Sequence, residues 1–285
     1  MSKTLIVQSF RDHDVPPWIA RCLASVAAWS RQRGYDYVLV GDEAFDLCGP
    51  EYLADVGDNR RSITNLARLE LVRRAHADGY DMATWVDADV FVFHPEAIAL
   101  DRVNRYAFAR ETWVEWRGAG RWFAFSSVNN SVFACRRGEP DLDFLISATR
   151  HVARRRRIRS NYQVGGDLIK GLRASLDFET LGDVGMLSNY VVMALATGGR
   201  RLLQQQARLH GEPIHASNLC ASENYSPRVG GGEAMAAMDA LQRSAGDVIN
   251  GWLEGRSGLG AGESVWFGSQ DLQAWLEAGP SISGH

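Results

Sequence analysis

Lysine is almost missing from this 285-residue sequence, since only two of its 31 basic side chains are lysines, Lys3 and Lys170. Together with 28 glycines and abundant alanine, the use of arginine in place of lysine indicates GC-rich codon usage and a bacterial source. An excess of basic charge is missing too, because 34 acidic residues leave a formal net charge of −3 at pH 7. The composition therefore excludes a protein held on nucleic acid by its overall charge.

Cysteine motifs and long apolar runs are also missing. The four cysteines are scattered and form no Cys-x-x-Cys pair, which argues against a zinc site, a redox motif or a disulfide framework. No run of about 18 apolar residues occurs, so a membrane-spanning helix is not expected, and the first ten residues do not resemble a secretory leader. We expect a soluble, cytoplasmic protein. Peripheral contact with a membrane and the oligomeric state stay open.

Strand and helix patterns alternate through the first third of the chain. β-branched runs predict the strands, and apolar residues at helical spacing predict the helices. The expected elements are a strand at 4–10, a helix from Ile19 to Gly34, a strand at 37–40, a helix at 63–77 and a strand at 82–86 that continues through 90–93. This order is typical of an α/β fold with a mostly parallel central sheet flanked by helices.

The pattern of the remaining chain is more mixed. We expect strands at 106–110 and 132–135, helices at 141–154 and 187–197, and a glycine-interrupted helical tail with helices at 235–241 and 272–276. No internal repeat or linker divides the sequence. A single domain over 1–285 is therefore expected.

The acidic pair in the segment Trp85-Val-Asp87-Ala-Asp89-Val is the clearest chemical feature. An apolar strand here ends in two carboxylates, at the edge where open parallel sheets bind ligands. On an extended segment alternate residues point the same way, so both carboxylates can face one site. Two like charges held close need a counter-cation, and their hard oxygens suit Mg²⁺ or Mn²⁺ shared with phosphates. The alternative is a solvated turn with two unrelated acidic residues.

The Asp-x-Asp strand end, preceded by the Ala-Arg-Leu sequence around Arg68, resembles GT-A fold glycosyltransferases. The local sequence of the motif is most similar to galactosyl- and mannosyltransferase-type and glycogenin-like families. The resemblance covers residues 3–220. The resemblance implies Mn²⁺ or Mg²⁺ bridging Asp89 and the diphosphate of a nucleotide sugar, with Asp87 on the ribose or the metal. It also implies a nucleotide-sugar half over about 1–95, an acceptor half over 96–225 and the tail over 226–285.

The resemblance suggests further donor-site residues. Arg68 stands where similar enzymes place a cation near the diphosphate, and a guanidinium suits phosphate oxygens. Gln8, Ser9 and Phe10 would line the nucleotide base pocket from the end of the first strand. His215 would complete the metal shell, with His210 as its competitor for that role. For each of these residues the alternative is an ordinary place in a strand, a helix or the core.

Candidates for contacts to the transferred sugar are two asparagines and two aspartates. Asn129 and Asn130 stand in a segment similar to the one that lies beside the donor sugar in these families. Asp167 and Asp183 are loop carboxylates that would act as a base in an inverting reaction or orient the donor in a retaining one. The sequence does not choose between them, and the alternative for each is a helix cap.

Large aromatic residues gather between Trp113 and Phe123, beside Gly118 and Gly120. Rings can stack on the apolar faces of sugars, and a glycine-hinged loop can close over a donor. Packing in the core is the alternative.

The leading interpretation is a metal-dependent glycosyltransferase with an unidentified acceptor, a glycan, lipid or natural product. One rival is a phosphohydrolase of the haloacid-dehalogenase type, which also uses Asp-x-Asp with Mg²⁺. The expected later acidic residue of that pattern is missing after Asp183. The second rival is a non-catalytic nucleotide- or glycan-binding domain, since a fold alone does not guarantee activity.

Overall fold

The computed structural model describes residues 2–118, 121–155, 158, 160–220, 229–244, 246–253 and 258–268. The strands are β1 Thr4–Ser9, β2 Asp36–Val40, β3 Met82–Val86, β4 Val90–Val92, β5 Tyr106–Trp116, β6 Arg121–Arg136, β7 Glu179–Leu181, β8 Val184–Met186, β9 Ala216–Asn218 and β10 Ser264–Gly268. The α-helices are α1 Pro17–Arg33, α2 Pro50–Val56, α3 Arg60–Ala77, α4 Asp141–Arg155, α5 Gly166–Leu172, α6 Asn189–Thr197, α7 Arg200–His210, α8 Gly231–Arg243 and α9 Asp247–Asn250. Short 3-10 helices are η1 Asp42–Cys48, η2 Pro95–Ala97 and η3 Asn161–Val164.

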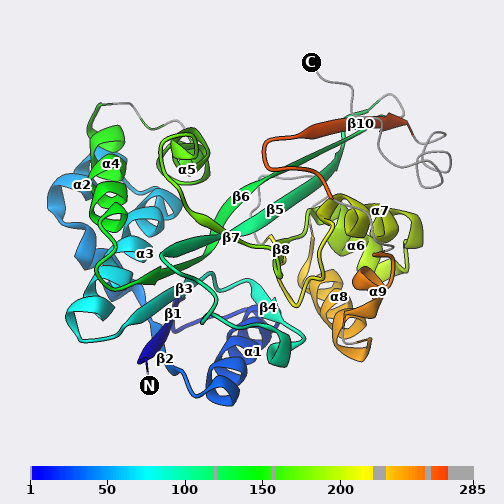
Figure 1. Cartoon of the computed structure of the whole chain (residues 1–285), viewed down its shortest axis with the longest axis horizontal. Helices are drawn as coiled ribbons and strands as arrows, with labels where there is room; N and C mark the ends of the chain where they lie inside the picture. The colour runs from blue at the N-terminus through cyan, green and yellow to red at the C-terminus, as the bar shows by residue number, and fades with distance from the viewer. Residues whose placement is uncertain are drawn as a thin grey trace.

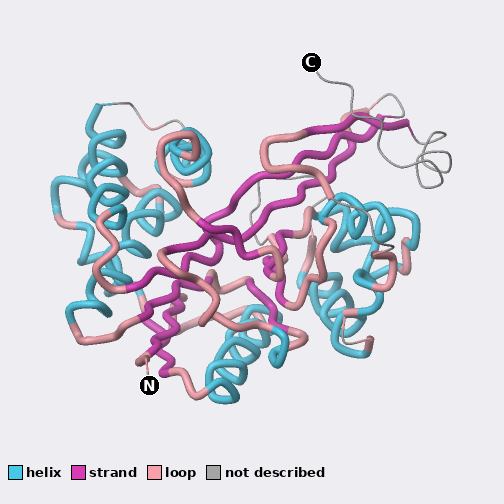
Figure 2. Tube along the Cα trace, in the orientation of Figure 1, coloured by secondary structure: helices cyan, strands magenta, loops and turns pink. Residues whose placement is uncertain are grey.

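The expected α/β class is confirmed, with a central sheet flanked by helices (Figures 1 and 2). The sheet has the strand order β2-β1-β3-β6-β5-β7, and β10 adds to it by pairing with β6. β1 runs parallel to β2 and β3, and β5 runs parallel to β7. β6 pairs antiparallel with β3, β5 and β10, so the parallel first half adjoins a mixed second half.

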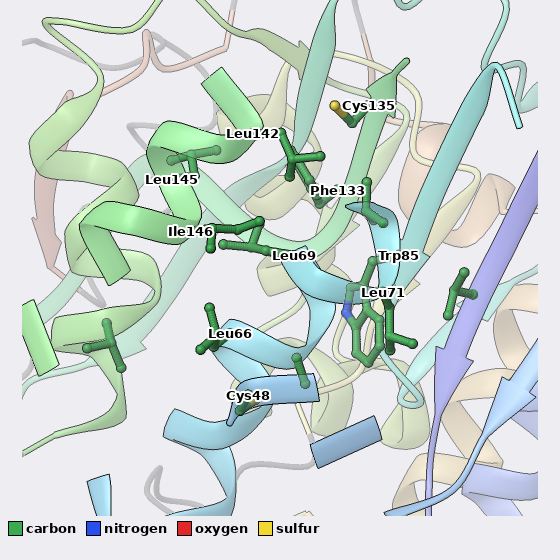
Figure 3. Close-up of a cluster of buried hydrophobic side chains, with 14 of the residues drawn as sticks. Cys48, Leu66, Leu69, Leu71, Trp85, Phe133, Cys135, Leu142, Leu145 and Ile146 are labelled. Carbon is green, nitrogen blue, oxygen red and sulfur yellow. The ribbon is translucent and has the colours of Figure 1, made fainter. Parts of the chain in front are cut away.

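The two faces of the central sheet are covered by different helices. Trp85 and Phe133 face α3 and α4, where they pack with Leu66 and Leu142 (Figure 3). The next residue along β3, Val86, belongs to the core on the opposite face, which α1 covers. This alternation follows from the pleat of the strands, which turns successive side chains to opposite faces.

The helix boundaries follow local chemistry. α1 starts with Pro17, whose fixed φ and missing N–H suit a first helical turn. It ends at Gly34, which has a φ of +69° and accepts the left-handed conformation without steric cost. The helix α3 is capped by Asn59, whose side chain accepts the Ser62 N–H at 3.1 Å.

The extended run at 90–93 does not continue the third strand. The chain turns at 87–89, and β4 joins β9 and β8 in a separate three-stranded sheet. The Asp-x-Asp segment is therefore a turn between two sheets. The apolar runs on both sides of the turn are continuous, because each strand is buried on both faces, so they could not reveal this change of sheet.

The aromatic segment is a long hairpin, where a loop was expected. β5 and β6 pair continuously from Ala109 to Trp116, and β10 pairs with the outer part of β6. Figure 1 shows this three-stranded ribbon reaching away from the body of the sheet. The tail thus contributes a strand as well as α8 and α9. The helix expected at 272–276 lies outside the described residues.

The four cysteines are buried free thiols. None of the helices in the described ranges has the length and apolar character that crossing a membrane requires.

Candidate active site

A cavity of about 550 Å³ opens where β1 and β3 end, the edge at which parallel sheets bind ligands. The end of β1, α3, the turn after β3, the β5–β6 hairpin and α5 all line it. Its charged lining residues are Arg61, Arg68, Asp87, Asp89, Glu111, Glu115, Arg117, Asp167 and Lys170. Cations and carboxylates thus face the same space, which suits a ligand that carries both phosphates and hydroxyls.

Asp87 begins the turn after β3 and is fixed on several sides. Its N–H donates to the Ser131 carbonyl at 2.7 Å, and its carbonyl accepts the Val90 N–H at 3.1 Å. Its Oδ1 accepts the Trp85 indole N–H at 2.6 Å and lies 3.4 Å from a guanidinium nitrogen of Arg68. Burial raises the pKa of Asp87, while the Arg68 charge and the Trp85 hydrogen bond oppose this shift. The carboxylate is therefore held in one orientation.

Arg68, expected near a donor diphosphate, lines the cavity from α3 and is 6% exposed. A terminal nitrogen donates to the Asn130 carbonyl, and Nε donates to the Thr64 carbonyl at 3.4 Å. The guanidinium carbon lies 5.4 Å from the centre of the Trp85 ring. These contacts fix the plane of the guanidinium, so a rigid cation faces the cavity beside Asp87.

Asp89, at the other end of the turn, lines the cavity and is tied to β9. Asn218 Nδ2 donates to Asp89 Oδ1 at 2.6 Å, and the Leu219 N–H donates to the Asp89 carbonyl at 3.0 Å. Asn218 Oδ1 accepts the Cys220 N–H at 2.7 Å, which fixes the orientation of the amide. Sequence reasoning missed Asn218, although it stands three residues after the candidate ligand His215.

Asn129 and Asn130 line the cavity at an irregularity of β6. The register of β5 and β6 shifts after Phe108, which leaves a bulge in β6. Asn130 Nδ2 donates to Asn65 Oδ1 at 3.0 Å, and Asn129 Oδ1 accepts the Ser131 N–H at 2.7 Å. Bulges re-aim side chains beside functional sites. Here the bulge brings two adjacent amides of one strand to the same cavity.

A second charged cluster lines the cavity from β5 and α5. Glu111 Oε2 lies 3.0 Å from Lys170 Nζ, which stands 5.3 Å from the centre of the Phe125 ring. Asp167, a candidate catalytic carboxylate, lines the cavity one turn of α5 before Lys170. Burial raises the pKa of Glu111, Lys170 opposes this, and the Asp167 charge adds to it. Glu111 stands in no recognisable motif, so the sequence offered no signal for it.

The three residues at the end of the first strand have different places. Ser9 and Phe10 line the cavity, but Gln8 is fully buried beneath it. Gln8 Nε2 donates to the Asp87 carbonyl at 3.1 Å, and the Tyr37 hydroxyl donates to Gln8 Oε1 at 3.0 Å. Gln8 therefore supports the backbone of the acidic turn.

Asp183 and His215 do not line the cavity. Asp183, between β7 and β8, forms an ion pair with Arg102. Burial raises the pKa of Asp183, and the Arg102 charge opposes this. The His215 N–H donates to the Asp183 carbonyl at 2.8 Å, and its ring meets the ring of His94 edge-on at 4.9 Å. The structure thus brings these two candidates to each other and not to the acidic pair.

His210, the competing histidine, is fully buried in the core. Its Nε2 lies 2.6 Å from the Gly182 carbonyl oxygen, and its Nδ1 lies 2.9 Å from the Thr112 hydroxyl. Both ring nitrogens are used within the protein. His210 is a structural histidine.

The acidic turn fits a divalent cation that is shared with a ligand. Asp87 and Asp89 supply carboxylate oxygens, which Mg²⁺ and Mn²⁺ prefer. Within the described ranges, no group of three or more His, Cys, Asp or Glu side chains is arranged to hold a metal ion. Mg²⁺ commonly binds through one or two carboxylates together with substrate phosphates and water. The donor set suits that mode and not a cage built by the protein alone.

No family model and no curated protein matches this sequence. The fold is similar to those of solved glycosyltransferases. One is a glycosyltransferase involved in the glycosylation of the major capsid of PBCV-1, at 9% identity and a TM-score of 0.47, with 84% of this chain and 98% of that chain covered. A second is GlyE of Streptococcus pneumoniae, at 14% identity and a TM-score of 0.41, with 92% of this chain and 66% of that chain covered.

A third similar structure is Drosophila β1,4-galactosyltransferase 7, solved with manganese, UDP-galactose and xylobiose. It has 12% identity and a TM-score of 0.28, with 49% of this chain and 50% of that chain covered. All three structures have identities of 14% or less and TM-scores below 0.5, so the likeness is one of fold alone.

Proposed function

We propose that this chain is a metal-dependent glycosyltransferase that moves a sugar, of the hexose type, from a nucleotide diphosphate sugar to an acceptor. The observation that carries the proposal is the convergence of Asp87, Asp89 and Arg68 on one cavity at the ligand-binding edge of the sheet. A bound diphosphate is stabilised by cations, and carboxylates can lie next to it only when a metal ion bridges the two. The cavity offers a cation, Arg68, and two such carboxylates in adjacent positions.

In this proposal, different residues at the sheet edge contact the metal, the diphosphate and the nucleoside of the donor. Asp87 and Asp89 would hold Mn²⁺ or Mg²⁺, which neutralises charge on a departing diphosphate when it is bound. Arg68 donates to phosphate oxygens from a fixed plane and so stabilises the same charge. Ser9 and Phe10 offer a hydroxyl and a ring to the nucleoside at the end of β1.

Residues of β6 and α5 would contact the transferred sugar. Asn129 and Asn130 present amides, which can donate to and accept from sugar hydroxyls. Asp167 is the candidate catalytic carboxylate that lines the cavity, and it would orient the sugar or take the proton of the acceptor. A glycan, a lipid or a natural product is the acceptor in this proposal.

The proposal is tested by a thermal-shift panel of nucleotide diphosphates and their sugars, with and without Mn²⁺. Binding raises the melting temperature by mass action. We expect a shift that needs both the metal and one nucleotide, and Asp89→Asn should abolish it. Asp239→Asn is the matched control, because Asp239 pairs with Arg21 on the surface and does not line the cavity.

Other outcomes favour the rival functions. If no nucleotide or nucleotide sugar raised the melting temperature, the proposal would be contradicted. Mg²⁺-dependent hydrolysis of p-nitrophenyl phosphate would then support a phosphohydrolase. Nucleotide-sugar binding without hydrolysis or transfer would support a binding domain.

A further inference from the structure

The outer part of the β5–β6 hairpin carries a row of rings on the side that faces the cavity. Trp113 is directly opposite Phe125, and Phe123 is directly opposite Trp266 of β10. Residues opposite each other in antiparallel strands share a face, as do residues two apart in one strand. Phe123 and Phe125 therefore connect the two pairs. We call these four residues the aromatic track.

The aromatic track runs from inside the cavity to solvent. Trp113 and Phe125 line the cavity, and Trp113 is buried. The ring centres of Phe125 and Phe123 are 5.9 Å apart, and those of Phe123 and Trp266 are 4.8 Å apart. Trp266 ends the row with 48% of its surface exposed. An exposed tryptophan thus continues a row of rings that starts in the candidate active site.

Each of the three outer rings has a cation beside it. Lys170 lies 5.3 Å from the centre of the Phe125 ring, Arg117 lies 5.4 Å from that of Phe123, and Arg121 lies 4.6 Å from that of Trp266. Arg117 also pairs with Glu115, which lines the cavity. The track therefore combines apolar ring surfaces with cationic groups that can donate hydrogen bonds.

The opposite face of the same ribbon is packed against the protein. Trp122 contacts the ring of Tyr190 on α6 at 5.3 Å and stacks on Phe267 at 6.3 Å. Trp116 lies on this side, with its ring centre 5.4 Å from that of Trp122, and is 36% exposed. The ribbon thus carries one exposed tryptophan on each face, and only Trp266 continues the row that reaches the cavity.

We propose that the aromatic track binds a carbohydrate acceptor, with sugar units along Phe123 and Trp266 and the reacting end at Trp113 and Phe125 in the cavity. This inference rests on the proposed function. Sugars present apolar C–H faces edged by hydroxyls, so they match rings flanked by guanidinium and carboxylate groups.

A membrane surface fits these observations less well. Interfacial anchors gather on one protruding face, whereas the two exposed tryptophans of the ribbon point to opposite faces. The track also leads to Glu111, Glu115 and Asp167, carboxylates that can accept hydrogen bonds from sugar hydroxyls. A carbohydrate chain therefore remains the one occupant that uses both the rings and the carboxylates.

The test compares Trp266→Ala with Trp116→Ala as the matched control. Calorimetric titrations use xylohexaose, cellohexaose, chitohexaose and a hyaluronan hexasaccharide as probes, and phosphatidylglycerol vesicles as the lipid arm. We expect at least one saccharide to bind the wild type and Trp116→Ala equally, and to bind Trp266→Ala roughly tenfold more weakly, the scale of a lost aromatic anchor. Trp266→Leu keeps an apolar side chain in β10 without the flat ring and should lose binding to the same extent.

Equal saccharide binding by Trp266→Ala and Trp116→Ala would overturn the inference, as would no binding of any saccharide. Vesicle binding lost in Trp266→Ala would replace it with a membrane contact, and a change of oligomeric state in that variant would replace it with a subunit interface. Nucleotide binding with Mn²⁺ is measured on the same samples and should be equal in all of them. If the wild type binds saccharide but no nucleotide, the proposed function fails, while the assignment of the aromatic track as a carbohydrate-binding surface is kept.

Discussion

Asn218 Nδ2 donates a 2.6 Å hydrogen bond to Asp89 Oδ1, and so joins the end of β9 to the acidic turn across 129 positions of sequence. Asp89 directly precedes β4, whose first residue, Val90, pairs with Asn218 of β9 in the small sheet that is separate from the central one. The orientation of the second carboxylate therefore depends on the second half of the chain. The acidic motif alone does not set it.

Asn218→Ala should weaken Mn²⁺ binding in the presence of nucleotide by about 10- to 100-fold, because partners of metal ligands commonly contribute that much. The measurement is a Mn²⁺ titration followed by thermal shift or calorimetry. Asn250→Ala is the control, since Asn250 bonds the Ile214 backbone through the same two amide atoms. That variant should lose stability and keep the Mn²⁺ affinity. An unchanged Mn²⁺ affinity in Asn218→Ala would show that Asp89 is oriented by other contacts.

Arg68→Lys should weaken binding of the nucleoside diphosphate roughly tenfold, even though the charge is kept. A lysine cannot reproduce the planar fork that contacts Asp87 and the Asn130 carbonyl together. Calorimetry with the nucleoside diphosphate and monophosphate measures this, and the diphosphate should be affected more. The control is Arg60→Lys, because Arg60 pairs with Asp42 on the surface near the start of the same helix. If binding of the diphosphate and the monophosphate were weakened equally, Arg68 would not contact the second phosphate.

Gln8→Leu should lower the free energy of unfolding by about 1–3 kcal/mol, because it removes one of the two hydrogen bonds that the Asp87 carbonyl accepts and takes away the acceptor of the Tyr37 hydroxyl. Urea denaturation measures this change. Gln8→Glu keeps an acceptor for Tyr37 but lacks the donor to Asp87, so it should impair Mn²⁺-dependent nucleotide binding as well. Full nucleotide affinity in both variants would mean that the turn keeps its shape without Gln8.

The sequence predicted the parts of the fold that local patterns encode. Buried runs at β1 and β3 and the helical spacing of α1 and α3 gave the α/β class, and Gly34 ended α1 as expected. The acidic pair lies at the sheet edge as predicted from the direction of β3. These features depend on residues close in sequence and on the general handedness and polarity of α/β units.

The features that the sequence did not predict depend on distant contacts. β10 pairs with β6 across about half the chain, and nothing near Trp266 signals that partner. Glu111 and Lys170 meet only because α5 packs on the hairpin. His210 and His215 stand five residues apart, and only their surroundings show that one is buried with both nitrogens bonded. Residue type and spacing alone could not separate a core histidine from a candidate ligand.

His210 gives the protein a defined sensitivity to acid. In the neutral ring, Nε2 donates to the Gly182 carbonyl, which can only accept, and Nδ1 accepts the Thr112 hydroxyl. Burial lowers its pKa from 6.5 to about 4, against the opposing Gly182 hydrogen bond. Between these two values the unfolded chain binds more protons than the folded one. The stability that neutral His210 contributes is therefore complete above pH 6.5 and is lost as the pH falls toward 4, by at most about 1.4 kcal/mol per pH unit.

His210→Asn should accordingly be less stable than the wild type at pH 7.5, because it loses well-placed hydrogen bonds, and its stability should fall less steeply between pH 6.5 and 4.5. Urea denaturation at four pH values in this range measures both slopes. His151→Asn, at an exposed position of α4, should keep the wild-type slope. Since His210 is the one titrating group that distinguishes the wild type from His210→Asn, the difference between these two slopes isolates His210. Parallel curves for His210→Asn and the wild type would mean that the buried ring is protonated in the folded protein without loss of its contacts.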